Sequence, residues 1–272
     1  MWLFTISAKT SLLISCFTLF TTNLFSGTVG FKAEKKAKEA LYTPLSQLEL
    51  EKRAREQAAF REKKSTNLHH AAESGRAGDV SLLLNLKACP NLIDDKGMTP
   101  VHLAAWHGHE KVVQVLVESK DPKVMIDLKD NNKQTALHKA AYKGHDACAK
   151  LLLEHGTDKN AVDQDRWTPL HWATRENKLS TVKLLIAYLA NVDAQDSQRR
   201  TPLWITAVFN RNLIATELMK AGADPTLAGQ HGDRYHTPAT IARIRKHVGL
   251  ALVLDAYEQA WIKEKKAAEK KL

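Results

Sequence analysis

Between residues 65 and 255, short apolar segments alternate with polar loops at a period near 33 residues. Each period opens on a threonine, usually followed by proline, as in Thr99-Pro-Val-His-Leu-Ala-Ala105. These threonines are Thr66, Thr99, Thr135, Thr168, Thr201 and Thr237, with steps of 33, 36, 33, 33 and 36 residues. A fixed period of this size predicts a repeat array, in which every unit is one supersecondary structure.

Each period predicts two helices separated by a tight turn. Threonine can cap the first helix, and proline at the first helical position gives up only an amide that has no partner. Nine residues after each of the first five threonines stands a residue suited to a left-handed turn: Gly75, Gly108, Gly144, Asn177 and Asn210. A second apolar segment follows at residues 80–84, 112–117, 149–153, 182–186 and 214–219. A single unit of this kind cannot enclose a core, so neighbouring units must stack.

The repeated segment resembles the ankyrin repeat, whose T-P-L-H-x-A signature and 33-residue period it reproduces over about residues 65–255. The resemblance implies an all-α solenoid of about five to six helix-turn-helix repeats. Two departures lengthen specific loops: 118–122 after a second helix, and 229–235 in the last finger, the loop that precedes a signature threonine. The last unit lacks the signature histidine and the glycine of the turn between its helices. This departure suits a C-terminal capping repeat with one face exposed to solvent.

The flanks differ from the repeats and suggest four regions. Residues 1–30 hold most of an uncharged run of 22 residues between Lys9 and Lys32, which is typical of a cleaved signal peptide or a retained membrane anchor. Residues 31–64 form a charged helical linker, 65–256 the repeat domain, and 257–272 a basic C-terminal helix or tail. We therefore expect export or membrane association; the alternative is a cytoplasmic protein whose start codon was wrongly chosen.

Composition removes several classes of function. Forty Lys and Arg against thirty Asp and Glu give a net charge of +10, which permits acidic partners, nucleic acid or anionic lipid without selecting one. Cys16, Cys89 and Cys148 form no C-x-x-C pair, so a disulfide scaffold and a cysteine zinc cluster are excluded. Phosphate-binding, dinucleotide-binding, zinc-protease and serine-nucleophile motifs are absent from the sequence.

Histidines recur in the signature but do not predict a metal site. His69, His102, His138 and His171 lie on successive units about 10 Å apart, whereas nitrogens that share one zinc ion approach within about 4 Å. The resemblance implies a structural hydrogen-bonding role for this histidine. Aspartates cluster in the fingers, where Asp stabilises turns. The sequence thus predicts no cofactor, no metal site and no catalytic residues.

The resemblance places partner binding on the finger tips and on the concave face formed by the first helices. By position, the two residues after each Ala-Ala pair fall on that face, and the residue before each signature threonine falls on a finger. The resulting candidate protein-binding residues are Met98, Trp106, His107, Gln134, Tyr142, Lys143, Trp167, Arg175, Glu176, Arg200 and Phe209. We expect Trp106, Tyr142, Trp167 and Phe209 to be exposed, the alternative being that they cover neighbouring repeats. Trp172 and Trp204 are expected in the core.

Two classes of function remain. The first is a non-enzymatic module that binds an unidentified protein partner and has no small-molecule substrate. The second is a membrane-surface or nucleic-acid binder driven by basic charge, with nucleic acid the less favoured; binding of that kind depends strongly on salt.

Overall fold

A computed structural model describes residues 67–121 and 123–269, and the regular secondary structure of these residues is almost entirely helical. Residues 67–73 are helical and precede the first helix with defined bounds. The helices are α4 (Ala77–Asn85), α5 (Pro100–His107), α6 (Glu110–Val117), α7 (Ala136–Lys143), α8 (Asp146–Glu154), α9 (Pro169–Arg175), α10 (Leu179–Ala187), α11 (Pro202–Phe209), α12 (Asn212–Lys220), α13 (Pro238–Ile244) and α14 (Val248–Glu269). Two short strands, β1 (Gly229–His231) and β2 (Arg234–His236), separate α12 from α13.

The helix starts and the turns follow the predicted signals. The signature threonines are extended residues directly before α5, α7, α9, α11 and α13, and proline opens every one of these helices except α7. Positive φ occurs at all five predicted turn positions: Gly75, Gly108, Gly144, Asn177 and Asn210. In the last repeat Lys246, nine residues after Thr237, adopts a φ of 63° at the same place.

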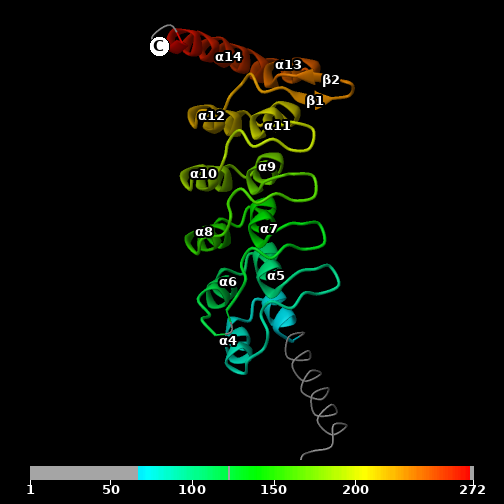
Figure 1. Ribbon diagram of the computed structural model, residues 1–272, viewed down its shortest axis with the longest axis vertical. Helices are drawn as coiled ribbons and strands as arrows, with labels where there is room; N and C mark the ends of the chain where they lie inside the picture. Colours follow the sequence, from blue (N-terminus) through cyan, green and yellow to red (C-terminus); the bar gives the residue numbers. More distant parts are fainter. Residues whose placement is uncertain (1–66, 122, 270–272) are drawn as a thin grey trace, which may run out of the picture. The chain divides into compact units, whose positions relative to one another are not determined.

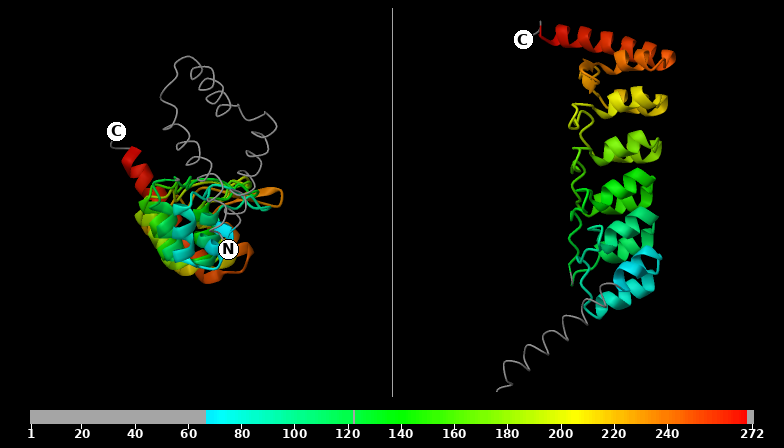
Figure 2. Two further views of the ribbon diagram at one scale, coloured as in Figure 1. Left: turned by 90° about the horizontal axis from the view of Figure 1, so that it is seen from below. Right: turned by 90° about the vertical axis from the view of Figure 1, so that its right-hand side faces the viewer.

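The repeats stack so that like helices form columns (Figure 1). The first helices of successive repeats, α5, α7, α9, α11 and α13, contact one another in that order. The second helices, α4, α6, α8, α10 and α12, form a parallel column beside them. The loops between repeats follow one another along one side of the stack (Figure 2). The predicted all-α repeat solenoid is confirmed.

One continuous core runs through the stack. Leu116, Leu152, Leu185 and Leu218, one from each second helix, are completely buried. Small alanines such as Ala104 and Ala140 are also completely buried, which lets adjacent first helices approach closely. The two helices of a repeat pack on each other and on the like helices of the next repeat, so the core is shared along the array and no repeat encloses a core of its own.

Three features refine the predicted organisation. The lengthened last finger contains the antiparallel hairpin β1–β2. Helix α14 continues through residue 256, where the repeat domain was expected to end, as far as Glu269. On the outer side of the cap, Val248 and Leu252 are exposed apolar residues, so this face is less polar than the sequence suggested.

The expected N-terminal hydrophobic segment (1–30) and charged linker (31–64) lie outside the described residues. Among the helices that are described, none combines the length and apolarity needed to cross a membrane.

Candidate functional site

The signature histidines link each first helix to the following finger. The Nδ1 atom of His102 accepts the Thr99 backbone N–H (3.2 Å), so its Nε2–H donates to the Gln134 carbonyl (3.0 Å). Three further bonds repeat this link across successive interfaces: His69 to Met98, His138 to Trp167 and His171 to Arg200. The structural hydrogen-bonding role is confirmed. In the described residues no three His, Cys, Asp or Glu side chains are grouped as metal ligands.

Burial fixes the charge state of these imidazoles. Desolvation lowers the pKa of His138 and of His171 to about 4, although the hydrogen bonds to the next finger act in the opposite direction. Both rings are therefore neutral at physiological pH and serve as fixed hydrogen-bonding groups.

The finger turns are organised by aspartates. The Oδ1 atom of Asp163 accepts the backbone N–H groups of Asp165 (3.0 Å) and Trp167 (2.8 Å). Asp94, Asp130 and Asp196 make the same pair of bonds in their own fingers. The bond to the fourth residue draws that residue back to the base of the finger, next to the following helix.

This turn corrects the prediction for the finger residues. Four residues were expected on the finger: Met98, Gln134, Trp167 and Arg200. Each lies four positions after a finger aspartate, and its carbonyl accepts the hydrogen bond from a signature histidine. None of the four is exposed, and Trp167 retains only 8% of its accessible surface. The expectation that Trp167 is exposed was wrong, and Trp106 and Tyr142, which were also expected to be exposed, are half-buried.

Four aromatic side chains form a continuous series across three repeats, and we call Trp106, Tyr142, Trp172 and Trp167 the aromatic strip. Trp106 of α5 stacks on Tyr142 of α7, with ring centroids 5.4 Å apart and planes within 9°. Tyr142 meets Trp172 of α9 edge to face at 5.5 Å, and Trp172 lies 4.8 Å from Trp167. The strip thus joins residues that are 66 positions apart in the sequence.

Cationic side chains lie over these rings. The Lys143 ammonium is 4.1 Å from the Trp106 ring centroid, and the Arg175 guanidinium is 5.4 Å from that of Trp172. Arg200 lies 5.6 Å from the Trp167 ring. Such cation–π contacts hold both partners in defined rotamers, so the strip is an ordered surface in which aromatic and cationic groups alternate.

Acidic groups at the finger bases anchor the strip from beneath. The Trp172 indole N–H donates to Asp163 (2.9 Å), and Arg200 pairs with Asp196 (2.7 Å). Lys139 forms a 2.6 Å ion pair with Asp130, in which both side chains are buried.

The remaining predicted residues divide into two groups. Lys143, Arg175 and Glu176 are half-buried beside the strip, and Arg175 also contacts Glu176 (3.6 Å). His107 is exposed at the end of α5, 3.9 Å from Glu73. Phe209 is 40% exposed at the end of α11, and among the described residues its ring has no aromatic neighbour. The structure therefore brings together Trp106, Tyr142, Lys143, Trp167, Arg175 and Arg200, and leaves Phe209 apart.

Trp172 was assigned to the core. It packs against the core but is only half-buried, and its ring also belongs to the strip. Trp204 is buried as expected, and its indole N–H donates to the His236 carbonyl (2.9 Å) in place of the histidine link. Helical spacing could have predicted that Trp172 and Lys139 lie beside the predicted surface residues. Each lies three residues before a predicted surface residue, Arg175 or Tyr142, and therefore shares its helix face.

A second set of histidine links was also missed. Each of these histidines directly precedes a second helix and bonds to a backbone carbonyl of the preceding repeat: His109 to Glu73, His145 to Trp106 and His247 to Val208.

Cys148 is buried, and burial raises the pKa of its thiol to about 11, so it is a protonated core residue at neutral pH.

Comparison with known proteins identifies the repeat. A family model described as "Ankyrin repeats (3 copies)" matches residues 45–126, 68–163, 122–196 and 156–229, together more than half of the chain. Similar stretches occur in the ankyrin repeat protein nuc-2 of Neurospora crassa (35% identity over 63 residues), the ARF GTPase-activating protein Git of Drosophila melanogaster (38% over 58) and the human transient receptor potential cation channel subfamily A member 1 (43% over 58). These stretches cover 23%, 21% and 20% of this chain but only 6%, 8% and 5% of the relatives.

Proposed function

Because this chain belongs to the ankyrin-repeat family, whose repeats are generally protein-interaction modules, we propose that it is a non-enzymatic module that binds a protein partner through the aromatic strip. Ankyrin repeats are typically non-enzymatic, and in this array the signature histidines link successive repeats while Asp94, Asp130, Asp163 and Asp196 organise the finger turns.

The aromatic strip is the observation that carries this proposal. Trp, Tyr and Arg are the residue types that most often dominate the binding energy of protein interfaces. Here they are combined on one face of α5, α7 and α9, and their mutual contacts restrict rotamers before any partner arrives. Preorganisation of this kind lowers the entropy that association must overcome.

The test uses the full chain as bait, with the captured partner identified by mass spectrometry. Replacing Trp106→Ala together with Tyr142→Ala should weaken binding of that partner by at least about thirtyfold, because truncating a central hot spot typically costs about 2 kcal/mol. The matched control is Leu213→Ala, which truncates a 69% exposed side chain on α12, in the other column.

The double variant also removes a stacked pair, which contributes about 0.5–1.5 kcal/mol to stability. Circular dichroism must therefore establish that it remains folded at the temperature of the assay. A folded variant with unchanged affinity would overturn the proposal that the strip is the binding surface.

We also propose that residues 1–30 direct the chain to export or to a membrane. The support is their long uncharged run alone. Deleting these residues should shift the protein into the soluble cytoplasmic fraction, and an unchanged distribution between fractions would contradict this role.

A further inference from the structure

The first lengthened loop is fastened to the repeat that precedes it. Asp121 pairs with Lys87 (2.6 Å), in the loop after α4. Asn91 donates to the Lys123 carbonyl (2.9 Å) and accepts the Met125 N–H (2.8 Å). These bonds hold Asp121, Lys123 and Met125 against the first described repeat.

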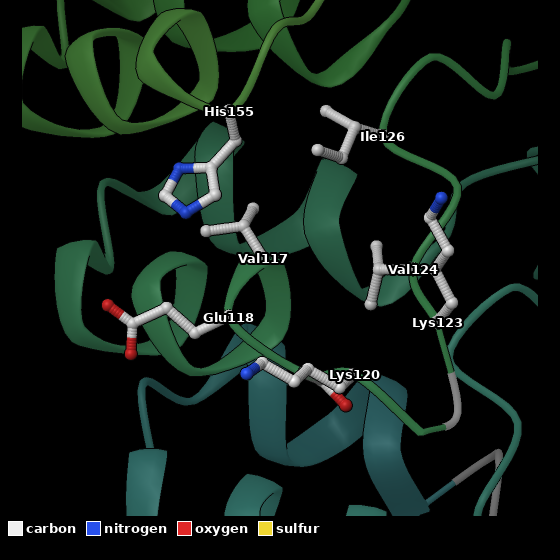
Figure 3. A pocket seen from close by; sticks show the side chains of 8 residues that line it. Val117, Glu118, Lys120, Lys123, Val124, Ile126 and His155 are labelled. Carbon is white, nitrogen blue, oxygen red and sulfur yellow. The ribbon is translucent and has the colours of Figure 1, made fainter.

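A hollow of about 700 Å³ lies between this loop, the end of α6 and the end of α8. Figure 3 shows the Val117, Val124 and Ile126 side chains together, with Glu118, Lys120, Lys123 and His155 around them. A second hollow of about 550 Å³ shares Val124, Ile126 and His155 with the first and continues over Met125 and Leu128. The two hollows form one open groove with successive apolar positions, a shape that suits an extended chain better than a compact ligand.

The rim of the groove carries two acidic and two basic side chains, and among the described residues only the acidic ones are engaged by neighbouring groups. Glu118 accepts a hydrogen bond from Gln114 (3.0 Å), and Asp127 accepts the Thr157 hydroxyl and the Asp158 backbone N–H. Asp121 is paired with Lys87. In the described part of the chain, the Lys120 and Lys123 ammonium groups have no carboxylate partner. His155 donates Nδ1–H to the Leu151 carbonyl (2.8 Å), which leaves Nε2 able to accept a hydrogen bond.

We propose that this groove is a second binding site, for an extended acidic peptide segment of a protein partner. An aliphatic side chain of the peptide packs on Val117, Val124 and Ile126, and a neighbouring carboxylate reaches Lys120 and Lys123. A peptide N–H donates to His155. The groove shares no residue with the aromatic strip, so the two sites can be tested independently.

The direct test measures fluorescence anisotropy of labelled synthetic peptides with the full chain. The probe is a short peptide in which Glu and Leu alternate. Two matched peptides, one with Gln in place of Glu and one with Ser in place of Leu, remove the charge or the aliphatic groups separately. We expect saturable binding of the Glu–Leu peptide and at least about tenfold weaker binding of both matched peptides.

Variants locate the site. Lys120→Ala with Lys123→Ala should weaken binding of the Glu–Leu peptide by about tenfold, because two exposed ion pairs with the peptide are lost. The control, Lys111→Ala with Lys183→Ala, removes the same charge from exposed positions on α6 and α10 and should change affinity by less than about twofold. Val117→Thr keeps the shape of the apolar floor but adds a hydroxyl, and should weaken binding by about threefold or more.

Several results would overturn the proposal. These are no saturable binding of the Glu–Leu peptide, equal binding of the Glu–Ser peptide, and an equal loss in the Lys111/Lys183 control, which would indicate unspecific attraction to the basic protein. Saturable binding of dodecanoate without binding of the peptide would assign the groove to an aliphatic carboxylate instead. A loss of peptide binding in the Trp106→Ala, Tyr142→Ala variant, with none in the Lys120/Lys123 variant, would place the peptide on the aromatic strip.

Discussion

At the scale of single residues, the buried pair of Asp130 and Lys139 shows how much depends on the finger aspartates. Asp130 accepts two backbone N–H groups through Oδ1 and pairs with Lys139 through Oδ2. The side chains of Asp130 and Lys139 are only 2% and 8% exposed, and Lys139 also donates to Gln134 (2.7 Å). A buried pair adds little net stability, but removing one partner leaves a charge without compensation in the interior.

The Lys139→Met substitution tests this dependence. It should lower the free energy of unfolding by about 3–5 kcal/mol, measured by urea denaturation, because Asp130 is left buried and unpaired. Adding Asp130→Asn should recover part of the loss, since the double variant has no unpaired charge. Lys150→Met on the exposed face of α8 is the control and should cost less than about 0.5 kcal/mol. Equal midpoints for Lys139→Met and the control would contradict this account.

Residue positions within a repeat could be predicted from the sequence, but exposure could not. The signature correctly placed Trp106, Tyr142 and Lys143 at the ends of first helices. It could not indicate that the aspartate turn would bury the Trp167 side chain, or that the Trp172 ring would contact Tyr142 of the preceding repeat. Both outcomes depend on side chains from neighbouring repeats, and a pattern read within one repeat does not contain that information.

At the scale of elements, each first helix from α5 to α11 is tied to the finger of the next repeat by a side-chain hydrogen bond. His102, His138 and His171 make this link through Nε2, and Trp204 makes it through its indole N–H. The link requires a neutral imidazole, because Nδ1 must accept the threonine N–H while Nε2–H donates. The contact between successive elements is therefore sensitive to protonation.

Acidification should weaken the array through these histidines. The pKa of His138 and of His171 is about 4 in the folded chain and about 6.5 when burial is lost, so the unfolded chain binds the extra proton first. Their contribution is complete above pH 6.5 and declines as the pH falls from 6.5 to 4, by on the order of 3 kcal/mol per histidine.

Chemical denaturation across this pH range provides the measurement. His171→Gln should be less stable than the wild type at neutral pH but should lose less stability on acidification. The exposed His70→Gln variant is the control and should follow the wild-type profile. A profile that stays flat between pH 6.5 and 4 in the wild type would show that the buried histidines do not limit stability.

The element boundaries followed from the sequence more closely than the irregular features. Threonine and proline predicted the helix starts, and Gly and Asn predicted the turns, because each of these residues has a backbone preference of its own. The turn at Lys246 had no such signal. The hairpin β1–β2 did have one, because Gly232-Asp233 is a dipeptide typical of two-residue hairpin turns, but the repeat pattern alone does not predict strands there. Lys246 takes a left-handed conformation because α13 and α14 must pack antiparallel, which is a tertiary requirement.

At the scale of the whole repeat array, stability is shared between neighbours, and the ends have a special role. Successive first helices and successive second helices contact one another, so each internal repeat is covered on both sides. The last repeat is different, since α13 covers α11 and α14 is anchored by the Tyr257 hydroxyl, which donates to the carbonyls of Met219 (3.1 Å) and Ala223 (2.9 Å). A quasi-linear array requires such a cap to shield the last apolar interface.

Removing this cap should therefore destabilise the array and make it associate. A chain that ends after residue 236 lacks α13 and α14, so it exposes the side of α11 that α13 covers and loses the Tyr257 anchor on Met219 and Ala223. We expect its thermal midpoint to fall by at least about 5 °C and its particle size in light scattering to increase.

The control ends after Ala260, so it keeps the buried part of α14 and the Tyr257 anchor while losing the basic end of the helix. It should remain monodisperse with a midpoint close to that of the full chain. Equal thermal midpoints for the two truncated chains would show that α13 and α14 do not stabilise the array, and that its stability resides in the repeats before them.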